Sequence, residues 1–174
     1  MKPFVDIQTV HEIDPTQISI ERQVERWDTS PFPVQNERAD VYFVASYNHT
    51  HVPITLYALK QGAYAVVEKP VVNDYEELDE LGKVLRNAGR KVFIGFHKRY
   101  GQFNGMALED LGVTYGDPIS YHSIVYELIQ PEFFWYNWPV SRSTFFANGC
   151  HQIDHFLHLN NFSKPKDFDI KLLQ

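Results

Sequence analysis

The stretch that decides the fold is "ADVYFVASYNHTHVPITLYALKQGAYAVVEKP", residues 39–70. Two nearly continuous apolar runs, "ADVYFVA" and "AYAVV", flank a segment with helical spacing that stops at Gly62. Such runs are typical of strands buried on both faces, and glycine is a common helix stop. The stretch therefore predicts a strand, a helix and a second strand.

An amphipathic helix is predicted over residues 73–87, directly after this unit. Three leucines share one of its faces: Leu78, Leu81 and Leu85. Asn73, with Glu76 three residues later, has the form of an N-terminal cap, and Gly89 closes the helix.

Further strands are predicted on both sides. "FVDIQTVHEID", residues 4–14, is rich in β-branched residues, and "KVFIGF", residues 91–96, follows the second helix. A short helical piece is expected in "ISIERQVERW", residues 18–27. The order β-α-β-α-β with short connections predicts an α/β fold with a parallel sheet and right-handed crossovers.

Polar side chains follow each of three predicted strands. The turn beginning at Ser46 follows the first, Glu68-Lys69-Pro70 the second, and residues 96–100 the third. Parallel sheets bind ligands at the carboxyl ends of their strands, and a proline after Lys69 gives the lysine a stiff corner. A ligand site is predicted at this sheet edge; a solvated surface Glu-Lys pair is the alternative.

Composition excludes several classes of protein. The chain has 174 residues and a formal net charge of −6, so it shows no basic footprint for nucleic acid. It has no apolar run long enough to span a membrane, and its N-terminus lacks the features of a signal peptide. Its single cysteine, Cys150, rules out an internal disulfide framework. We expect a cytoplasmic protein that binds neither nucleic acid nor membrane.

Residues 39–100 resemble the nucleotide-binding domain of the glucose–fructose oxidoreductase and inositol dehydrogenase family (Gfo/Idh/MocA). Members of that family show a Thr-Pro-Asn-x-x-His-like turn, a strand closed by Glu-Lys-Pro, and a later strand ending in Gly-Phe/Tyr-x-x-Arg. Asn48 and His51 match the turn, and Gly95 and Arg99 match the last motif.

The segment "ANGCHQIDHFLHL", residues 147–159, is similar to the family's Gly-x-His-x-Ile-Asp run, which opens a helix of the second domain. His151 matches the histidine. The family usually has an aspartate four residues earlier, where this chain has Ala147. Asn148 could substitute, although it is offset by one residue.

The resemblance implies an incomplete, Rossmann-type dinucleotide-binding domain over residues 1–100. Residues 101–174 would begin an α+β domain for substrate binding and oligomerisation, in which "ISYHSIVYEL", residues 119–128, is predicted to form a strand with its apolar side buried. No Gly-x-Gly-x-x-Gly turn occurs in the chain. We therefore expect a piece of such an enzyme, lacking the first βα unit and much of the second domain.

The implied chemistry is hydride transfer between a sugar- or polyol-like alcohol and NAD or NADP. His151 would be the base and Lys69 would hold the reacting oxygen, with Asn148 as a further substrate contact. The resemblance also implies a set of residues that bind the cofactor: Glu12 (with Asp14 as runner-up), Ser46, Asn48, His51, Glu68, Lys69, Pro70 and Arg99. A homo-oligomer is expected for the full-length protein.

Two other functions stay open. A degenerate relative could bind a sugar or a partner without catalysis. A metal could bind the helix after Gly149, where one broad face carries four possible ligands: His151, Asp154, His155 and His158. The aromatic stretch "PEFFWYNWP", residues 131–139, suits packing or sugar stacking, and packing is favoured.

Overall fold

The computed structural model describes residues 6–17, 26–30, 32–33, 37–89, 91–126, 128, 131, 138–141, 145–167, 169 and 171. The chain divides into two compact units. Unit 1 comprises Met1–Ser46, Thr50–Val67 and Asp74–Phe93; unit 2 comprises Tyr47–His49, Glu68–Asn73 and Ile94–Gln174. The domain boundary between residues 100 and 101 stays a prediction.

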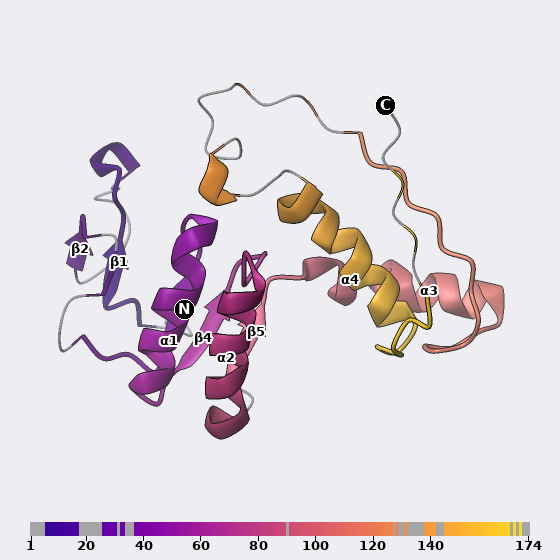
Figure 1. Cartoon of the computed structure of the whole chain (residues 1–174), viewed down its shortest axis with the longest axis horizontal. Coiled ribbons are helices and arrows are strands. Elements are labelled where there is room, and N and C mark those ends of the chain that lie inside the picture. Colours follow the sequence, from indigo (N-terminus) through magenta and orange to yellow (C-terminus); the bar gives the residue numbers. More distant parts are fainter. Residues whose placement is uncertain are drawn as a thin grey trace. The chain divides into compact units, whose positions relative to one another are not determined.

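Unit 1 is built around a three-stranded sheet. Its strands are β3 (Val41–Val44), β4 (Tyr64–Val67) and β5 (Val92–Ile94), in the order β3-β4-β5. β3 and β4 pair in parallel. The helices α1 (His51–Lys60) and α2 (Tyr75–Ala88) connect the strands and lie on one face of the sheet (Figure 1). The predicted β-α-β-α-β order and α/β class are confirmed.

The core of this unit lies between that face and the two helices. Its fully buried side chains include Val67 on β4, Val52 and Thr55 on α1, and Leu81 of α2 is also buried. Leu78, predicted to share the buried face of α2, is exposed.

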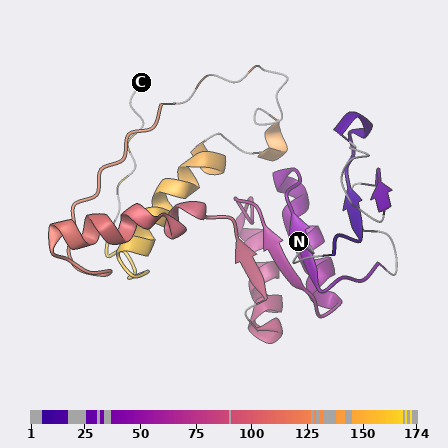
Figure 2. The same cartoon turned by 180° about the vertical axis from the view of Figure 1, so that it is seen from behind.

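The opposite face of the sheet carries exposed aromatic residues, so the expected burial of both faces is wrong. Phe43, Tyr64 and Phe93 are 69%, 45% and 54% exposed. Successive right-handed crossovers that advance in one direction place their helices on the same face, and Figure 2 shows the strands from the side away from α1 and α2. The apolar pattern predicted the strands but not which face the connecting helices would cover.

The N-terminal cap of α2 is Asp74, one residue after the predicted Asn73. The Asp74 side chain accepts a hydrogen bond from the backbone N–H of Glu77 at 2.9 Å. The Asn73 side chain instead donates to the backbone oxygen of Asn48 at 3.0 Å. Both residue types cap helices, so the sequence alone did not separate them.

Asp74→Ala is expected to lower the free energy of unfolding by about 1 kcal/mol, because the backbone N–H of Glu77 loses its acceptor. Chemical denaturation measures the change. Asp79→Ala, in the exposed middle of the same helix, is the control and should cost about 0.5 kcal/mol or less. Equal losses for the two variants would contradict the capping role.

The N-terminal part of unit 1 forms a separate two-stranded sheet. β1 (Thr9–His11) pairs in parallel with β2 (Arg26–Asp28). The predicted strand over residues 4–14 is thus present but shorter. The predicted helical piece is wrong at residues 26–27, where pairing with β1 overrides local spacing; residues 18–25 lie outside the described residues.

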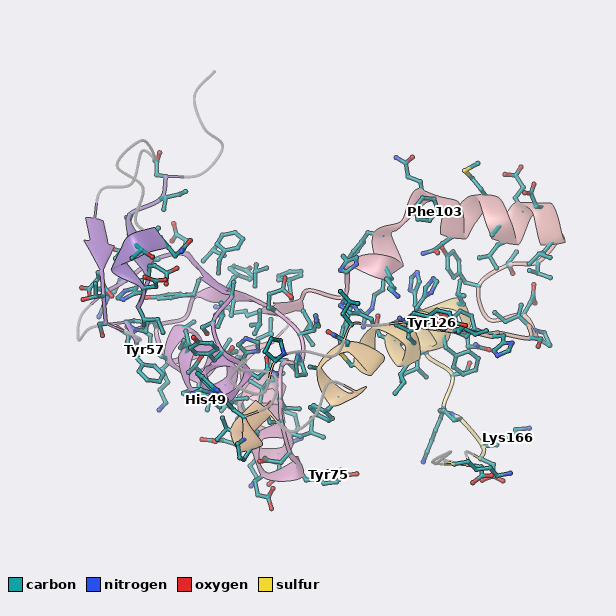
Figure 3. All side chains as sticks on the ribbon, turned by 90° about the horizontal axis from the view of Figure 1, so that it is seen from above. His49, Tyr57, Tyr75, Phe103, Tyr126 and Lys166 are labelled. Atoms are coloured by element: carbon teal, nitrogen blue, oxygen red, sulfur yellow. The ribbon has the colours of Figure 1, made fainter. Side chains whose placement is uncertain are left out.

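Hydrogen bonds tie the segment after β2 to the rest of unit 1. The His11 Nε2 lies 2.8 Å from a Glu37 carboxylate oxygen. The backbone oxygen of Glu37 accepts hydrogen bonds from Tyr42 on β3 and from Tyr57 on α1, which Figure 3 labels.

Unit 2 contains the helices α3 (Gln102–Leu111) and α4 (Cys150–Leu159). A π-helical turn, Phe145–Gly149, leads into α4, and a 3₁₀ helix, His97–Tyr100, contacts it. The predicted strand at 119–128 is not formed over residues 119–126. Ile124 and Tyr126, the second of which Figure 3 labels, are exposed there. A strand needs a pairing partner, and the described part of the chain provides none there. Within the described residues, no helix has the length and apolar character needed to cross a membrane.

Candidate functional site

Lys69 links the Glu-Lys-Pro motif to the start of α4. Its Nζ donates hydrogen bonds to the backbone oxygen of Ala147 at 3.2 Å and to the Asn148 Oδ1 at 3.0 Å. These residues are 78 and 79 positions away in sequence. The structure thus brings together Lys69 and the segment that precedes His151, while their roles in a shared site stay a prediction.

His151 lies in the first turn of α4, and its ring packs against two aromatic neighbours. The ring of His97 packs against it with centroids 4.7 Å apart, and Phe96 lies at 6.0 Å. The residue is only 8% exposed. Its Nδ1 is buried and has no hydrogen-bond partner among the described residues. Since a buried polar atom without a partner is costly, this atom is a candidate ligand contact.

The surroundings of His151 lower its pKa from 6.5 to about 4. Burial is the main cause, because it disfavours the charged imidazolium. Electrostatic interactions with Lys69, His97 and Lys98 lower the pKa further, while the interaction with Glu68 raises it. His151 is therefore neutral across the physiological pH range; one ring nitrogen keeps its lone pair, and burial makes the ring a weaker base than a free imidazole.

The titration of His151 should be visible in the NMR shifts of its ring protons, with a midpoint near pH 4. Because the unfolded chain binds this proton near pH 6.5, stability should fall as the pH drops from 6.5 toward 4. Lys69→Met should move the midpoint upward by removing a nearby positive charge. A midpoint at 6.5 in the native protein would contradict the buried environment.

Gly95 leaves room for the carboxylate of Glu68. A Cβ at Gly95 would lie 3.2 Å from the Glu68 carboxyl carbon and oxygens. That carboxylate also accepts a hydrogen bond from the backbone N–H of Lys69 at 3.2 Å. Gly95, which follows the third strand of the sheet-edge prediction, thus leaves room for the side chain of Glu68, which follows the second strand.

Arg99 is engaged by Asp154, one turn after His151 on α4. The Arg99 Nε donates to Asp154 Oδ2 at 2.7 Å, and its Nη2 donates to Oδ1. This pairing raises the pKa of Arg99. The guanidinium also lies over the rings of Phe96 and Phe162, at 5.2 and 4.8 Å. Here Arg99 joins the 3₁₀ helix to α4; its cofactor contact stays a prediction.

Asn48 belongs to unit 2 and is buried. Its backbone oxygen accepts the hydrogen bond from Asn73, and its Nδ2 is buried with no hydrogen-bond partner among the described residues. An unpaired amide N–H of this kind suits the carbonyl or hydroxyl oxygen of a ligand.

Three other predicted cofactor residues lie in unit 1 and have local partners there. The His51 Nε2 lies 3.0 Å from the backbone oxygen of Ser46, and the ring is buried. The Ser46 hydroxyl pairs with that of Thr50. The Glu12 side chain accepts a hydrogen bond from the backbone N–H of Asp14 at 3.0 Å. Their roles toward a cofactor stay predictions.

The helix after Gly149 does not gather metal ligands. Among the described residues, no group of three His, Cys, Asp or Glu side chains is placed to hold a metal ion. Asp154 binds Arg99, and His155 lies 3.1 Å from the Tyr121 hydroxyl and 2.9 Å from the Asn104 Oδ1. The metal hypothesis therefore gains no support from α4.

The predicted sheet-edge site included residues 96–100, but His97 and Lys98 had no predicted role of their own there. His97 packs on His151, and the Lys98 Nζ donates to the Gln152 Oε1 at 2.9 Å. They lie three and four residues after the end of β5, within the strand-end segment that the sequence placed at this edge. The aromatic stretch of residues 131–139 falls largely outside the described residues, although Trp138 contacts Tyr47 with ring centroids 5.1 Å apart.

A parallel sheet with ionisable groups after its strands is characteristic of nucleotide-dependent enzymes. The family model described as "Oxidoreductase family, NAD-binding Rossmann fold" (GFO_IDH_MocA) matches residues 7–96, and the chain belongs to this family. Its cofactor class is therefore the nicotinamide dinucleotide predicted from the sequence.

Solved structures support this assignment. Myo-inositol 2-dehydrogenase from Lactobacillus plantarum is 27% identical with a TM-score of 0.56, over 62% of this chain and 34% of that one. A putative oxidoreductase from Klebsiella pneumoniae is 22% identical with a TM-score of 0.59, over 88% and 42% of the two chains, and shows likeness of fold. The match thus spans about a third of the length of the inositol dehydrogenase. No curated protein sequence matches the chain.

The residues present fit one end of a nicotinamide dinucleotide. The unpartnered Asn48 Nδ2 and His151 Nδ1 offer polar contacts for a nicotinamide, its ribose or a substrate oxygen. The pyrophosphate end usually needs a glycine-rich turn before a helix N-terminus, and this sequence has no Gly-x-Gly-x-x-Gly. Contact between these residues and the reactive end of the cofactor stays a prediction.

Proposed function

We propose that this chain forms the reactive part of an NAD(P)-dependent dehydrogenase acting on a sugar- or polyol-like alcohol. The observation that carries the proposal is the pairing of Lys69 with the segment that leads into His151. The similarity to myo-inositol 2-dehydrogenase supports a polyol as substrate. Association into a homo-oligomer is part of the same proposal.

The nicotinamide ring, when bound, supplies the hydride acceptor. Lys69 uses two of its N–H groups on Ala147 and Asn148, which leaves the third for the oxygen of the reacting alcohol. This contact stabilises negative charge as the hydroxyl loses its proton. His151, neutral and with a free Nδ1, accepts that proton. Glu68 accepts a hydrogen bond from the backbone N–H of Lys69, and the unpaired Asn48 Nδ2 offers a further polar contact to the ligand.

A non-catalytic sugar-binding relative is the second candidate. It is favoured by Ala147, which replaces the family's usual aspartate, and by the lack of a glycine-rich turn in the sequence. Such a protein would bind a polyol without needing the cofactor.

Incubation with NAD⁺ or NADP⁺ and myo-inositol separates the two candidates. The proposed enzyme should reduce the cofactor, as followed by absorbance, and should bind it in calorimetry. Binding of myo-inositol with neither cofactor binding nor reduction would overturn the proposal in favour of the binding protein.

A further inference from the structure

Lys69 carries a positive charge that its described neighbours do not neutralise. Both of its hydrogen-bond acceptors, the Ala147 backbone oxygen and the Asn148 amide oxygen, are uncharged. Asn148, offset by one residue from Ala147, thus contacts the lysine with an amide rather than a carboxylate. Among the described residues no ion pair involves Lys69.

The other charged groups near His151 also leave an excess of positive charge. Arg99 is neutralised by Asp154. Lys98, like Lys69, has an uncharged partner, the amide oxygen of Gln152. Glu68 is the carboxylate that opposes these lysines at His151, and it is solvent-exposed, so water screens it. In the described residues, two ammonium groups therefore face one screened carboxylate.

This excess charge affects which alcohols the site prefers. A neutral polyol would leave the half-buried Lys69 without a counter-charge, whereas a carboxylate on the substrate would supply one. A carboxylate on the carbon next to the reacting hydroxyl lies within a few ångströms of the same ammonium.

We propose that the substrate is a sugar acid, a polyhydroxylated carboxylate with the acid group beside the reacting hydroxyl, and that Asn148 sets this preference by leaving Lys69 uncompensated. The proposal rests on the proposed function in that it names the substrate class of the same site. Asn148 is here a specificity residue, and an aspartate in its place would act as an internal substitute for the substrate's carboxylate.

D-gluconate and sorbitol are a matched pair of probes, because they differ in having a carboxylate or a hydroxymethyl group at one end. Dissociation constants are measured from the NMR shifts of the His151 ring with the whole chain. We expect gluconate to bind about tenfold more tightly than sorbitol. Asn148→Asp keeps the side-chain shape and should bring the two affinities within about twofold. Asn87→Asp, an exposed change of equal charge in unit 1, should leave the preference intact.

Equal binding of the two probes, binding of neither, or a preference unchanged in Asn148→Asp would overturn the proposal. Tighter binding of glucose 6-phosphate than of gluconate would also overturn it, in favour of a phosphorylated substrate. The readout needs no hydride transfer, so a gluconate preference without cofactor reduction would refute the proposed function but leave the preference for a carboxylate ligand, and the part of Asn148 in it, intact.

Discussion

Replacing His151 by asparagine is expected to lower kcat/KM for cofactor reduction by roughly 10²- to 10⁴-fold, the usual contribution of a positioned acid or base. The variant keeps a polar group at the start of α4 but removes the atom that accepts the proton. Steady-state assays with the alcohol substrate and NAD⁺ measure the loss. Because the pKa of His151 is near 4, the native activity should not fall on account of this group between pH 8 and 5.

His122→Asn is the matched control, since His122 also lies in unit 2 but is exposed. It should retain nearly full activity. A loss below about tenfold in His151→Asn would exclude His151 as the base. An acid limb with a midpoint near 6.5 in the native enzyme would instead assign the proton transfer to a different, exposed histidine.

The strands and helices of unit 1 could be predicted because apolar periodicity records burial directly. β3, α1, β4, α2 and β5 all lie where that pattern places them. The predictions that failed depend on contacts between segments that are distant in the sequence. The exposure of Phe43 depends on which face the helices cover, and the loss of helix at Arg26 depends on pairing with β1.

In the candidate site, too, the local motifs could be predicted from the sequence and the tertiary contacts could not. The strand-end rule and the Glu-Lys-Pro motif placed Lys69, and the structure brings it to the segment before His151. The contact with Asn148 could not be read from its offset, because residues 145–149 form a π-helical turn, which holds more residues per turn than an α-helix. Counting positions from Ala147 was therefore no guide to the side chain that reaches the lysine. The packing of His97 on His151 is likewise a tertiary contact that no spacing in the sequence predicts.

The Arg99–Asp154 pair is expected to be the largest single ionic contribution to the stability of unit 2. Its side chains are 27% and 7% exposed, and the bonding is bidentate. Asp154→Asn should lower the free energy of unfolding by about 2–4 kcal/mol, because it leaves the guanidinium half-buried without a counter-charge. Denaturation followed by near-UV circular dichroism measures the loss.

Arg99→Gln should cost at least as much, because Asp154 is the more deeply buried partner and would keep an uncompensated carboxylate. The double variant should lose about 1–3 kcal/mol less free energy of unfolding than the sum of the two single losses. Asp79→Asn, which breaks the exposed pair with Lys83, is the control and should cost about 0.5 kcal/mol or less. If the losses at Asp154 and Asp79 were equally small, the rings of Phe96 and Phe162 would hold Arg99, and its guanidinium would be free to meet the cofactor as the sequence predicted.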